Sequence, residues 1–159
     1  HRLYRIMTTD YPRASHFARP GLAAGPCLLK DTLQLASFFN NNFFLGHSAM
    51  LVNEGLPNFL VEELEKKLGG TLNQKTIAIF GMTFKIDSDD IRDSLSFKIK
   101  KKLEQKLATV LTVDPYLAGM CPADEALRKA HGIILGVPHT AFREIRPAVP
   151  FVDCWNAWS

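Results

Sequence analysis

Hydrophobic and polar positions recur with a helical period over most of the first 70 residues, after polar loop material that precedes Gly25. One helix is predicted from Pro26 through CLLKDTLQLASFF to the polar run at 40–42, because proline is favoured at the first helical position. A second helix is predicted from about 47 to 68, where apolar residues recur every four positions and form a buried stripe: Val52, Leu56, Leu60, Leu64 and Leu68. Residues 1–72 are therefore expected to form a helical region.

From residue 74 onward, short apolar runs typical of buried strands alternate with amphipathic helical segments. Strands are predicted at 76–81 and 109–115, in GIILGVP and in AVPFVDC, and helices at 93–106 and in ADEALRKA. Strands that alternate with helices in this way form a parallel sheet covered by the helices. The chain is therefore expected to be an α/β protein, with a helical segment followed by a Rossmann-like domain at 73–159.

The composition is that of an ordinary globular protein, with 159 residues, 47% of them hydrophobic, and a formal net charge of +3. This mild excess of base suits an anionic small molecule, whereas nucleic-acid binding needs a concentrated basic face. The lysines of the 93–106 helix are expected to form its solvated side, opposite an apolar face made by Leu95, Ile99, Leu103 and Leu107. No apolar run reaches the roughly 18 residues of a membrane helix, so neither nucleic acid nor membrane is an expected partner.

The three cysteines, Cys27, Cys121 and Cys154, match neither a zinc-ligand spacing nor a disulfide framework. No metal site is expected, and a reducing, cytoplasmic setting is the simplest interpretation. The chain begins at His1 rather than at a methionine, so it is interpreted as part of a longer protein.

The segment GPCLLKD places Cys27 in the first turn of a predicted helix, with Lys30 and Asp31 three and four positions further on. The positive end of a helix favours a thiolate, and this spacing puts the three side chains on one face. A nucleophile, a cation and a carboxylate that orients water are a set suited to covalent catalysis. The same residues also describe a small buried cysteine beside two surface charges, and the C-x-x-K-D pattern alone favours that second interpretation.

Three separate segments resemble one enzyme family. GLAAGPCLLKD resembles the catalytic cysteine loop of the UDP-glucose/GDP-mannose dehydrogenase family, and IAIFGMTFKIDSDDIRDS (77–94) is similar to its nucleotide-binding segment. TVDPYL (112–117) is similar to a strand end of that family. The segments occur in family order with family-like spacing, and together with the helix that carries Asn53 and Pro57 they cover most of the chain.

The resemblance implies a dehydrogenase that oxidises the C6 alcohol of a UDP- or GDP-sugar to a carboxylate with two NAD⁺. Cys27 would form a thiohemiacetal and then a thioester, Lys30 would support charge on the reacting oxygens, and Asp31 would position the hydrolytic water. In that family an N-terminal Rossmann domain binds NAD, a helical region carries the cysteine and the dimer contact, and a C-terminal domain binds the nucleotide. The chain resembles only the last two, and its FGMTFK loop lacks G-x-G-x-x-G, so NAD is assigned to an upstream domain.

The resemblance also implies a set of substrate-binding residues. Gly25 belongs to the cysteine loop, Phe84 would pack near the sugar nucleotide, and Lys85 would offer a charge to its sugar or phosphate oxygens. Gly81 would let the backbone approach the ligand closely. Arg92 is equally consistent with ligand binding and with an ion pair to a neighbouring aspartate, which would be Asp89, Asp90 or Asp93.

Other polar residues of the second half have weaker assignments. Asp114 is consistent with a contact to a ribose hydroxyl and equally with a turn before Pro115. His139 lies in a loop at the carboxyl edge of the predicted sheet, and the sequence offers it no role beyond capping. Cys121 and Cys154 are interpreted as packing residues.

The chain also departs from the family pattern. GLAAGPC is one residue longer than the family loop and lacks its aromatic residue, and DCWNAWS stands where many relatives have an arginine. Lys30 slightly favours the UDP-glucose or GDP-mannose branch over N-acetylated sugars.

A homodimer is expected, and the chain alone, without an NAD domain, is expected to be inactive. Two other functions stay open. One is a non-catalytic nucleotide-sugar-binding or dimerisation module. The other is a thiol-redox protein, which the lack of a second cysteine near Cys27 disfavours.

Overall fold

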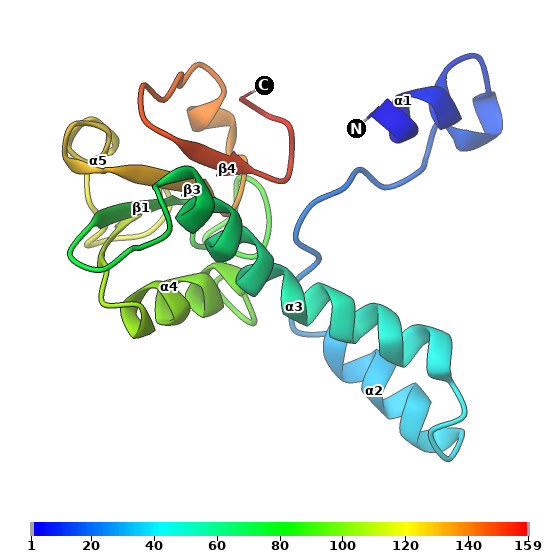
Figure 1. The fold of residues 1–159 in the computed structure, drawn as a ribbon. Helices are drawn as coiled ribbons and strands as arrows, with labels where there is room; N and C mark the ends of the chain where they lie inside the picture. The colour runs from blue at the N-terminus through cyan, green and yellow to red at the C-terminus, as the bar shows by residue number, and fades with distance from the viewer. Residues whose placement is uncertain (1, 159) are drawn as a thin grey trace.

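The computed structural model describes residues 2–158 and is built around a parallel sheet of four strands in the order β2-β1-β3-β4 (Figure 1). The strands are β1 (Thr76–Phe80), β2 (Thr109–Val113), β3 (Gly132–Leu135) and β4 (Phe151–Asp153). The central strand β3 is buried along its whole length, as is β1 beyond its first residue, because helices or loops cover both faces of the sheet. The predicted α/β class is confirmed.

The helices in this part of the chain are α1 (Arg2–Thr8), α2 (Leu28–Phe38), α3 (Phe44–Lys67), α4 (Leu95–Gln105) and α5 (Ala123–Lys129). Short 3₁₀ turns lie at Pro12–Ala14 and Thr140–Phe142. Helix α1 forms where the sequence predicted a polar loop, and none of its residues is buried. A helix without a buried face leaves no periodic pattern by which the sequence could reveal it.

Helix α2 begins at Leu28, so the predicted start at Pro26 was wrong. The first i→i+4 bond runs from the Asp31 N–H to the Cys27 carbonyl at 2.8 Å, which makes Cys27 the N-cap. Pro26 and Cys27 form the turn before the helix. The cysteine therefore stands at the helix entrance, half a turn earlier than expected.

Two apolar clusters fill the spaces on either side of the sheet. The first cluster joins α3 and α4 to the sheet, and its fully buried members include Leu60, Leu64, Ile77, Ile79, Ile99 and Leu103. The second cluster lies around α5 and the C-terminal segment, and it includes Phe80, Ile133, Leu135, Phe142 and Trp158. Because the C-terminal half of α3 belongs to the first cluster, packing continues across residues 72–73, and a domain boundary there stays a prediction.

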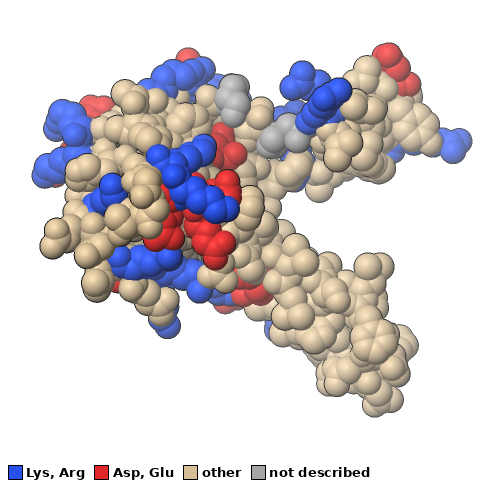
Figure 2. All heavy atoms as spheres, viewed as in Figure 1, with Lys and Arg blue, Asp and Glu red and all other residues tan. Residues whose placement is uncertain are grey.

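The N-terminal half of α3 projects away from the sheet, and its free end lies beside α2 (Figure 1). The predicted buried stripe is therefore wrong at one end, because Leu60 and Leu64 are fully buried whereas Val52 is 69% exposed. The projecting ends of α2 and α3 carry almost no charge on the face shown in Figure 2. Large apolar side chains are exposed along both helices, among them Leu33, Phe38, Phe44, Leu45 and Leu51.

Helix α4 packs as predicted at Leu95, Ile99 and Leu103, but Leu107 lies beyond the end of the helix. Leu107 has a φ of 61° and is exposed, and Ala108 joins the core after it. Two of the α4-segment lysines make ion pairs with α3, Lys98 with Glu54 and Lys106 with Glu65. Part of the lysine run therefore links two helices rather than forming a free basic surface. Within residues 2–158 no helix is both long and apolar enough to cross a bilayer.

The carboxyl ends of β1 and β3 meet at two glycines. Gly81 has a φ of 90°, and a Cβ built on it would lie 2.5 Å from both the backbone nitrogen and the oxygen of Val137. A Cβ on Gly136 would lie 2.3 Å from the Ser96 hydroxyl, which donates to the Gly81 carbonyl at 2.7 Å. Only glycine fits at these two positions, where the backbones after β1 and β3 approach each other closely.

Replacing Gly81 with alanine should destabilise the fold by about 3 kcal/mol or more, because the added carbon meets backbone atoms in a left-handed conformation. Urea denaturation of the wild type and of Gly81→Ala measures this difference in the free energy of unfolding. Gly55→Ala is the matched control, since a Cβ there meets nothing within 4 Å in helix α3. That variant should gain about 0.5–1 kcal/mol from helix propensity. Unchanged stability of Gly81→Ala would contradict the tight crossing.

Candidate functional site

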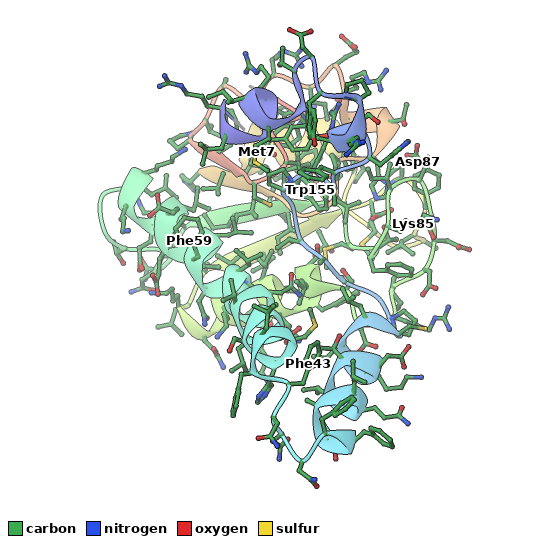
Figure 3. The ribbon with its side chains drawn as sticks, turned by 90° about the vertical axis from the view of Figure 1, so that its right-hand side faces the viewer. Met7, Phe43, Phe59, Lys85, Asp87 and Trp155 are labelled. Atoms are coloured by element: carbon green, nitrogen blue, oxygen red, sulfur yellow. The ribbon has the colours of Figure 1, made fainter. Side chains whose placement is uncertain are left out.

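An extended segment, residues 19–27, leads from the N-terminal turns to α2 and passes over residues that follow β1 and β4 (Figure 3). We call it the cysteine strap. It forms no helix or strand up to Leu28, so its path depends on contacts from other elements. Three such contacts hold it.

The first contact is a two-way pair between a side-chain amide and a peptide. The side-chain oxygen of Asn53, in α3, accepts from the Ala23 N–H at 3.1 Å, and its amide nitrogen donates to the Ala23 carbonyl at 2.6 Å. Asn53 is buried, so both of its polar atoms need such partners. The sequence offered one signal for this role, a polar residue at a position of α3 that faces the protein.

The second contact is the Trp155 ring, which packs against Gly21. A Cβ on Gly21 would sit 2.2 Å from this ring, so no larger residue fits without a shift of the strap. The ring is fixed in turn, because its N–H donates to the Gly136 carbonyl at 3.0 Å and its backbone N–H donates to Asp153 at 2.8 Å. Trp155 thus holds the strap against the turn that follows β4.

The third contact joins the strap to the loop between β1 and α4. The Phe84 ring would be 3.1 Å from a Cβ on Gly25, whose φ of 121° is itself available mainly to glycine. The predicted site residues Gly25 and Phe84 therefore touch each other. This contact brings the cysteine end of the strap to the loop of residues 82–93, which we call the Lys85 loop.

Cys27 is exposed at the entrance of α2 and has two cations nearby. Lys30 forms an ion pair with Asp31 at 3.0 Å, and both side chains face solvent. The hydrogen bond and the charge of Asp31 raise the pKa of Lys30, and the nearby Cys27 thiolate adds a smaller contribution. Cys27, Lys30 and Asp31 therefore lie together, as the i+3 and i+4 spacing predicted, and the cysteine is not walled into the core.

Arg92 reaches the same neighbourhood from the Lys85 loop. It makes a bidentate pair with Asp90, with nitrogen–oxygen distances of 2.6 and 3.0 Å, so the partner among the three aspartates is Asp90. These hydrogen bonds raise the pKa of Arg92, and Cys27 contributes to the same rise through its charge. Arg92 therefore adds a second cation, far from Cys27 in sequence, to the charged groups around the end of the strap.

The other two predicted substrate-binding residues, Gly81 and Lys85, have different surroundings. The space beside Gly81 is filled by Val137, so the glycine accommodates a neighbouring strand end and leaves no open surface for a ligand on that side. Lys85 is exposed on its loop (Figure 3), and its ammonium group makes no ion pair with another described residue in 2–158. Lys85 is therefore exposed to an anionic ligand, whereas a role of Gly81 in ligand binding stays a prediction.

Asp114 and His139 form a buried pair that sequence reasoning missed. Both side chains have no exposed surface, and His139 Nε2 lies 3.0 Å from Asp114 Oδ2. Asp114 also accepts from the backbone N–H groups of Met82 and Tyr116, at 2.7 and 2.9 Å. A contact between Asp114 and a ribose hydroxyl is therefore excluded in this arrangement. The available signal was positional, because β2 and β3 flank β1 and residues after their carboxyl ends must meet there.

A cavity of about 450 Å³ opens between the start of the strap and the ends of β3 and β4. Its lining combines two arginines, two tryptophans and smaller groups: Arg19, Arg143, Trp155, Trp158, Ile86 and Asn156. Guanidinium groups bind phosphates, so the two arginines of this lining suit an anionic ligand. Within residues 2–158, no group of three or more histidine, cysteine or acidic side chains gathers as a metal site would require.

Residues 78–159 match the UDP-glucose/GDP-mannose dehydrogenase family, UDP binding domain. The chain belongs to this family. A UDP-N-acetyl-D-mannosamine dehydrogenase of Pyrococcus horikoshii is 29% identical over 87% of this chain and 34% of its own length. A UDP-glucose 6-dehydrogenase of Bacillus subtilis is 34% identical over 69% of this chain and 26% of its own length.

Among solved structures of the family, a UDP-glucose dehydrogenase from Pyrobaculum islandicum has the same fold. The TM-score is 0.84 at 22% identity, over 99% of this chain and 40% of the other. The chain spans about a quarter to a third of the length of these curated relatives. By name they act on both N-acetylated and plain sugars, so the slight preference drawn from Lys30 stays a prediction.

Replacing Asn53 with alanine should release the strap, because Ala23 loses both of its hydrogen-bond partners. Amide hydrogen exchange at Ala23 should accelerate by about 10–100-fold, as expected for the loss of two part-buried hydrogen bonds. Asn58→Ala, at an exposed site of the same helix, is the control and should leave this exchange unchanged. Equal exchange in both variants would mean that the strap is held elsewhere.

The three thiols should differ in reactivity. Burial is the main factor that raises the pKa of Cys154, to about 11, and burial also raises the pKa of Cys121. Cys154 is therefore almost entirely a thiol at pH 7–9, and its alkylation rate should rise about tenfold per pH unit there. Exposed Cys27 should react with iodoacetamide first, as measured by peptide mass spectrometry. Equal labelling of the three in the folded protein would contradict this, and equal labelling in urea is the control.

Proposed function

We propose that this chain supplies the cysteine and the nucleotide-sugar-binding part of an NAD-dependent nucleotide-sugar 6-dehydrogenase. The observation that carries the proposal is the clamped strap, in which the contact between Gly25 and Phe84 holds the exposed Cys27 next to the Lys85 loop of the family's UDP-binding domain. A nucleotide held by this domain would thus present its sugar near the sulfur. Family membership, the exposed thiol and the nearby cations support the same assignment.

The sheet of this chain does not fit NAD in the way a Rossmann dinucleotide site does. The turn after β1 lacks G-x-G-x-x-G, and its one glycine, Gly81, is packed against Val137. A dinucleotide pyrophosphate therefore has no backbone cradle there. In our proposal, hydride removal belongs to NAD⁺ bound by a part of the protein outside these residues.

The residues of this chain account for the covalent part of the reaction. The Cys27 thiolate adds to the C6 aldehyde, forming a carbon–sulfur bond while the aldehyde oxygen takes up the electron pair and then a proton. Lys30 and Arg92 stabilise the negative charge on sulfur before the addition, and Lys30 supports charge on the oxygen during it.

After oxidation to the thioester, a water oriented by Asp31 adds to the carbonyl carbon. The carbon–sulfur bond then breaks, which releases the carboxylate and restores the thiolate.

The nucleotide would lie along the edge that carries the Lys85 loop and the cavity. The Lys85 ammonium makes no ion pair with another residue of 2–158, and Arg19 and Arg143 line the cavity, so positive groups remain for a diphosphate. Phe84 would pack against the sugar nucleotide from the loop, on the ring face that Gly25 leaves free. Either a UDP- or a GDP-sugar fits this chemistry, and UDP is favoured by the description of the family domain.

The assembly that we propose is a homodimer, with the exposed apolar surface of α2 and α3 covered in the complete protein. Soluble proteins rarely leave such a surface open to water. The three free cysteines are consistent with the reducing, cytoplasmic setting expected from their number and spacing.

UDP should raise the melting temperature of this chain. At a hundred times Kd, ligand binding stabilises the folded state by about 2.7 kcal/mol, which corresponds to a rise of roughly 5–10 °C for a chain of this size. Lys85→Ala should abolish most of the shift, whereas Lys101→Ala, on the exposed side of α4, should retain it. Differential scanning fluorimetry with UDP, GDP and their sugars checks this. A flat response to all of them would refute nucleotide binding.

A further inference from the structure

The Lys85 loop is fastened to the protein by a fully buried imidazole. His139 Nδ1 accepts a hydrogen bond from the Asp87 backbone N–H at 2.9 Å. Because Nδ1 faces an N–H donor, it carries no proton, and the proton of the neutral ring must lie on Nε2. Nε2 then donates to Asp114 Oδ2 at 3.0 Å, with the Thr83 hydroxyl 3.3 Å away. The loop, the end of β2 and the turn after β3 thus meet at one ring.

The Asp114 carboxylate and the Thr83 hydroxyl also bond to the first part of the loop, up to Lys85. Asp114 accepts from the Met82 N–H at the beginning of the loop, and the Thr83 hydroxyl donates to the Lys85 carbonyl at 2.9 Å. His139 holds the loop after Lys85, at Asp87. Phe84 and Lys85 therefore lie between two anchored points, and both anchors belong to the pair of Asp114 and His139.

Asp87 itself adopts a conformation that needs support. Its φ of 52° lies in the left-handed region, which is unfavourable for a residue with a side chain. Its carboxylate accepts from the backbone N–H and the hydroxyl of Thr140, at 2.9 and 2.5 Å, and from the Tyr116 hydroxyl at 3.0 Å. Residues 139 and 140 thus hold both the main chain and the side chain of Asp87.

We propose that His139 is a positioning residue for the nucleotide sugar, acting through Nδ1 on Asp87 to hold Phe84 and Lys85 in place before the ligand arrives. The proposal rests on the proposed function for the identity of the ligand, and on the structure for the anchoring. A loop that is already ordered loses less conformational freedom on binding, so the anchor strengthens affinity without touching the ligand. His139 contributes no group to the reaction itself.

Two substitutions separate the two nitrogen atoms of the ring. In His139→Asn the side-chain oxygen stands near the position of Nδ1 and can accept from the Asp87 N–H. In His139→Gln the side-chain amide nitrogen reaches the position of Nε2 and can donate to Asp114, which leaves the Asp87 N–H without a partner. Both variants bury one amide group in the same site. A difference between them in loop exchange or in UDP affinity therefore reports on the hydrogen bond made by Nδ1.

Hydrogen exchange of the loop without ligand is the first measurement. Residues 83–92 should exchange at least tenfold faster in His139→Gln than in the wild type, and within about threefold of the wild type in His139→Asn. Calorimetric titration with UDP should show a Kd about 5–20-fold weaker for the glutamine variant and nearly unchanged for the asparagine variant. Urea denaturation of both variants measures their overall stability, so that loop exchange can be compared at known global stability.

Equal exchange and equal affinity in the two variants would overturn the proposal, because the Nδ1 bond would then make no difference. If neither variant folds, ¹⁵N chemical shifts of the wild-type imidazole decide, and a proton on Nδ1 at neutral pH would refute the anchor. If the wild type does not bind UDP, the proposed function fails, while loop exchange still tests the anchoring by His139.

Discussion

The pair between the Asn53 side chain and the Ala23 peptide is the interaction on which the position of Cys27 depends. A strap without secondary structure has no helix or sheet hydrogen bonds to define its path, so contacts from other elements must define it. Asn53 does so from α3, whose other half is built into the core of the sheet. Because α3 is anchored in the core, it fixes the position of the strap. The strap in turn places Cys27 at the edge of the sheet.

Small residues in the strap are a condition for this arrangement. Gly21 and Gly25 let the rings of Trp155 and Phe84 lie directly against the backbone, where any side chain would separate them. The rings come from different loops, one after β4 and one after β1. The position of the strap therefore depends on the loops after β1 and β4. A shift of either loop would move the Cys27 sulfur.

The acidic side chains at this edge are mostly engaged with the protein itself. Asp114 and Asp87 accept from backbone and side-chain donors, and Asp153 accepts from the N–H groups of Trp155, Ala157 and Trp158. Among the described residues no fully buried side-chain nitrogen or oxygen lacks a partner. These three carboxylates are satisfied by the loops that they hold together, and no ion pair joins any of them to the exposed Lys85. Loops that are held by carboxylate hydrogen bonds, with an exposed lysine beside them, are well suited to bind a diphosphate.

The sequence by itself determined the elements whose causes are local. Apolar periodicity predicted the four strands, the helices from α2 onward and the α/β class, and the i+3 and i+4 spacing predicted that Lys30 and Asp31 accompany Cys27. The tertiary structure alone decided which distant residues meet: Asn53 with Ala23, Gly81 with Val137 and Asp114 with His139. It also decided which half of α3 is buried. Periodicity records the side of an element that avoids water, whereas these contacts depend on which strand ends become neighbours, and that is set only when the whole sheet has assembled.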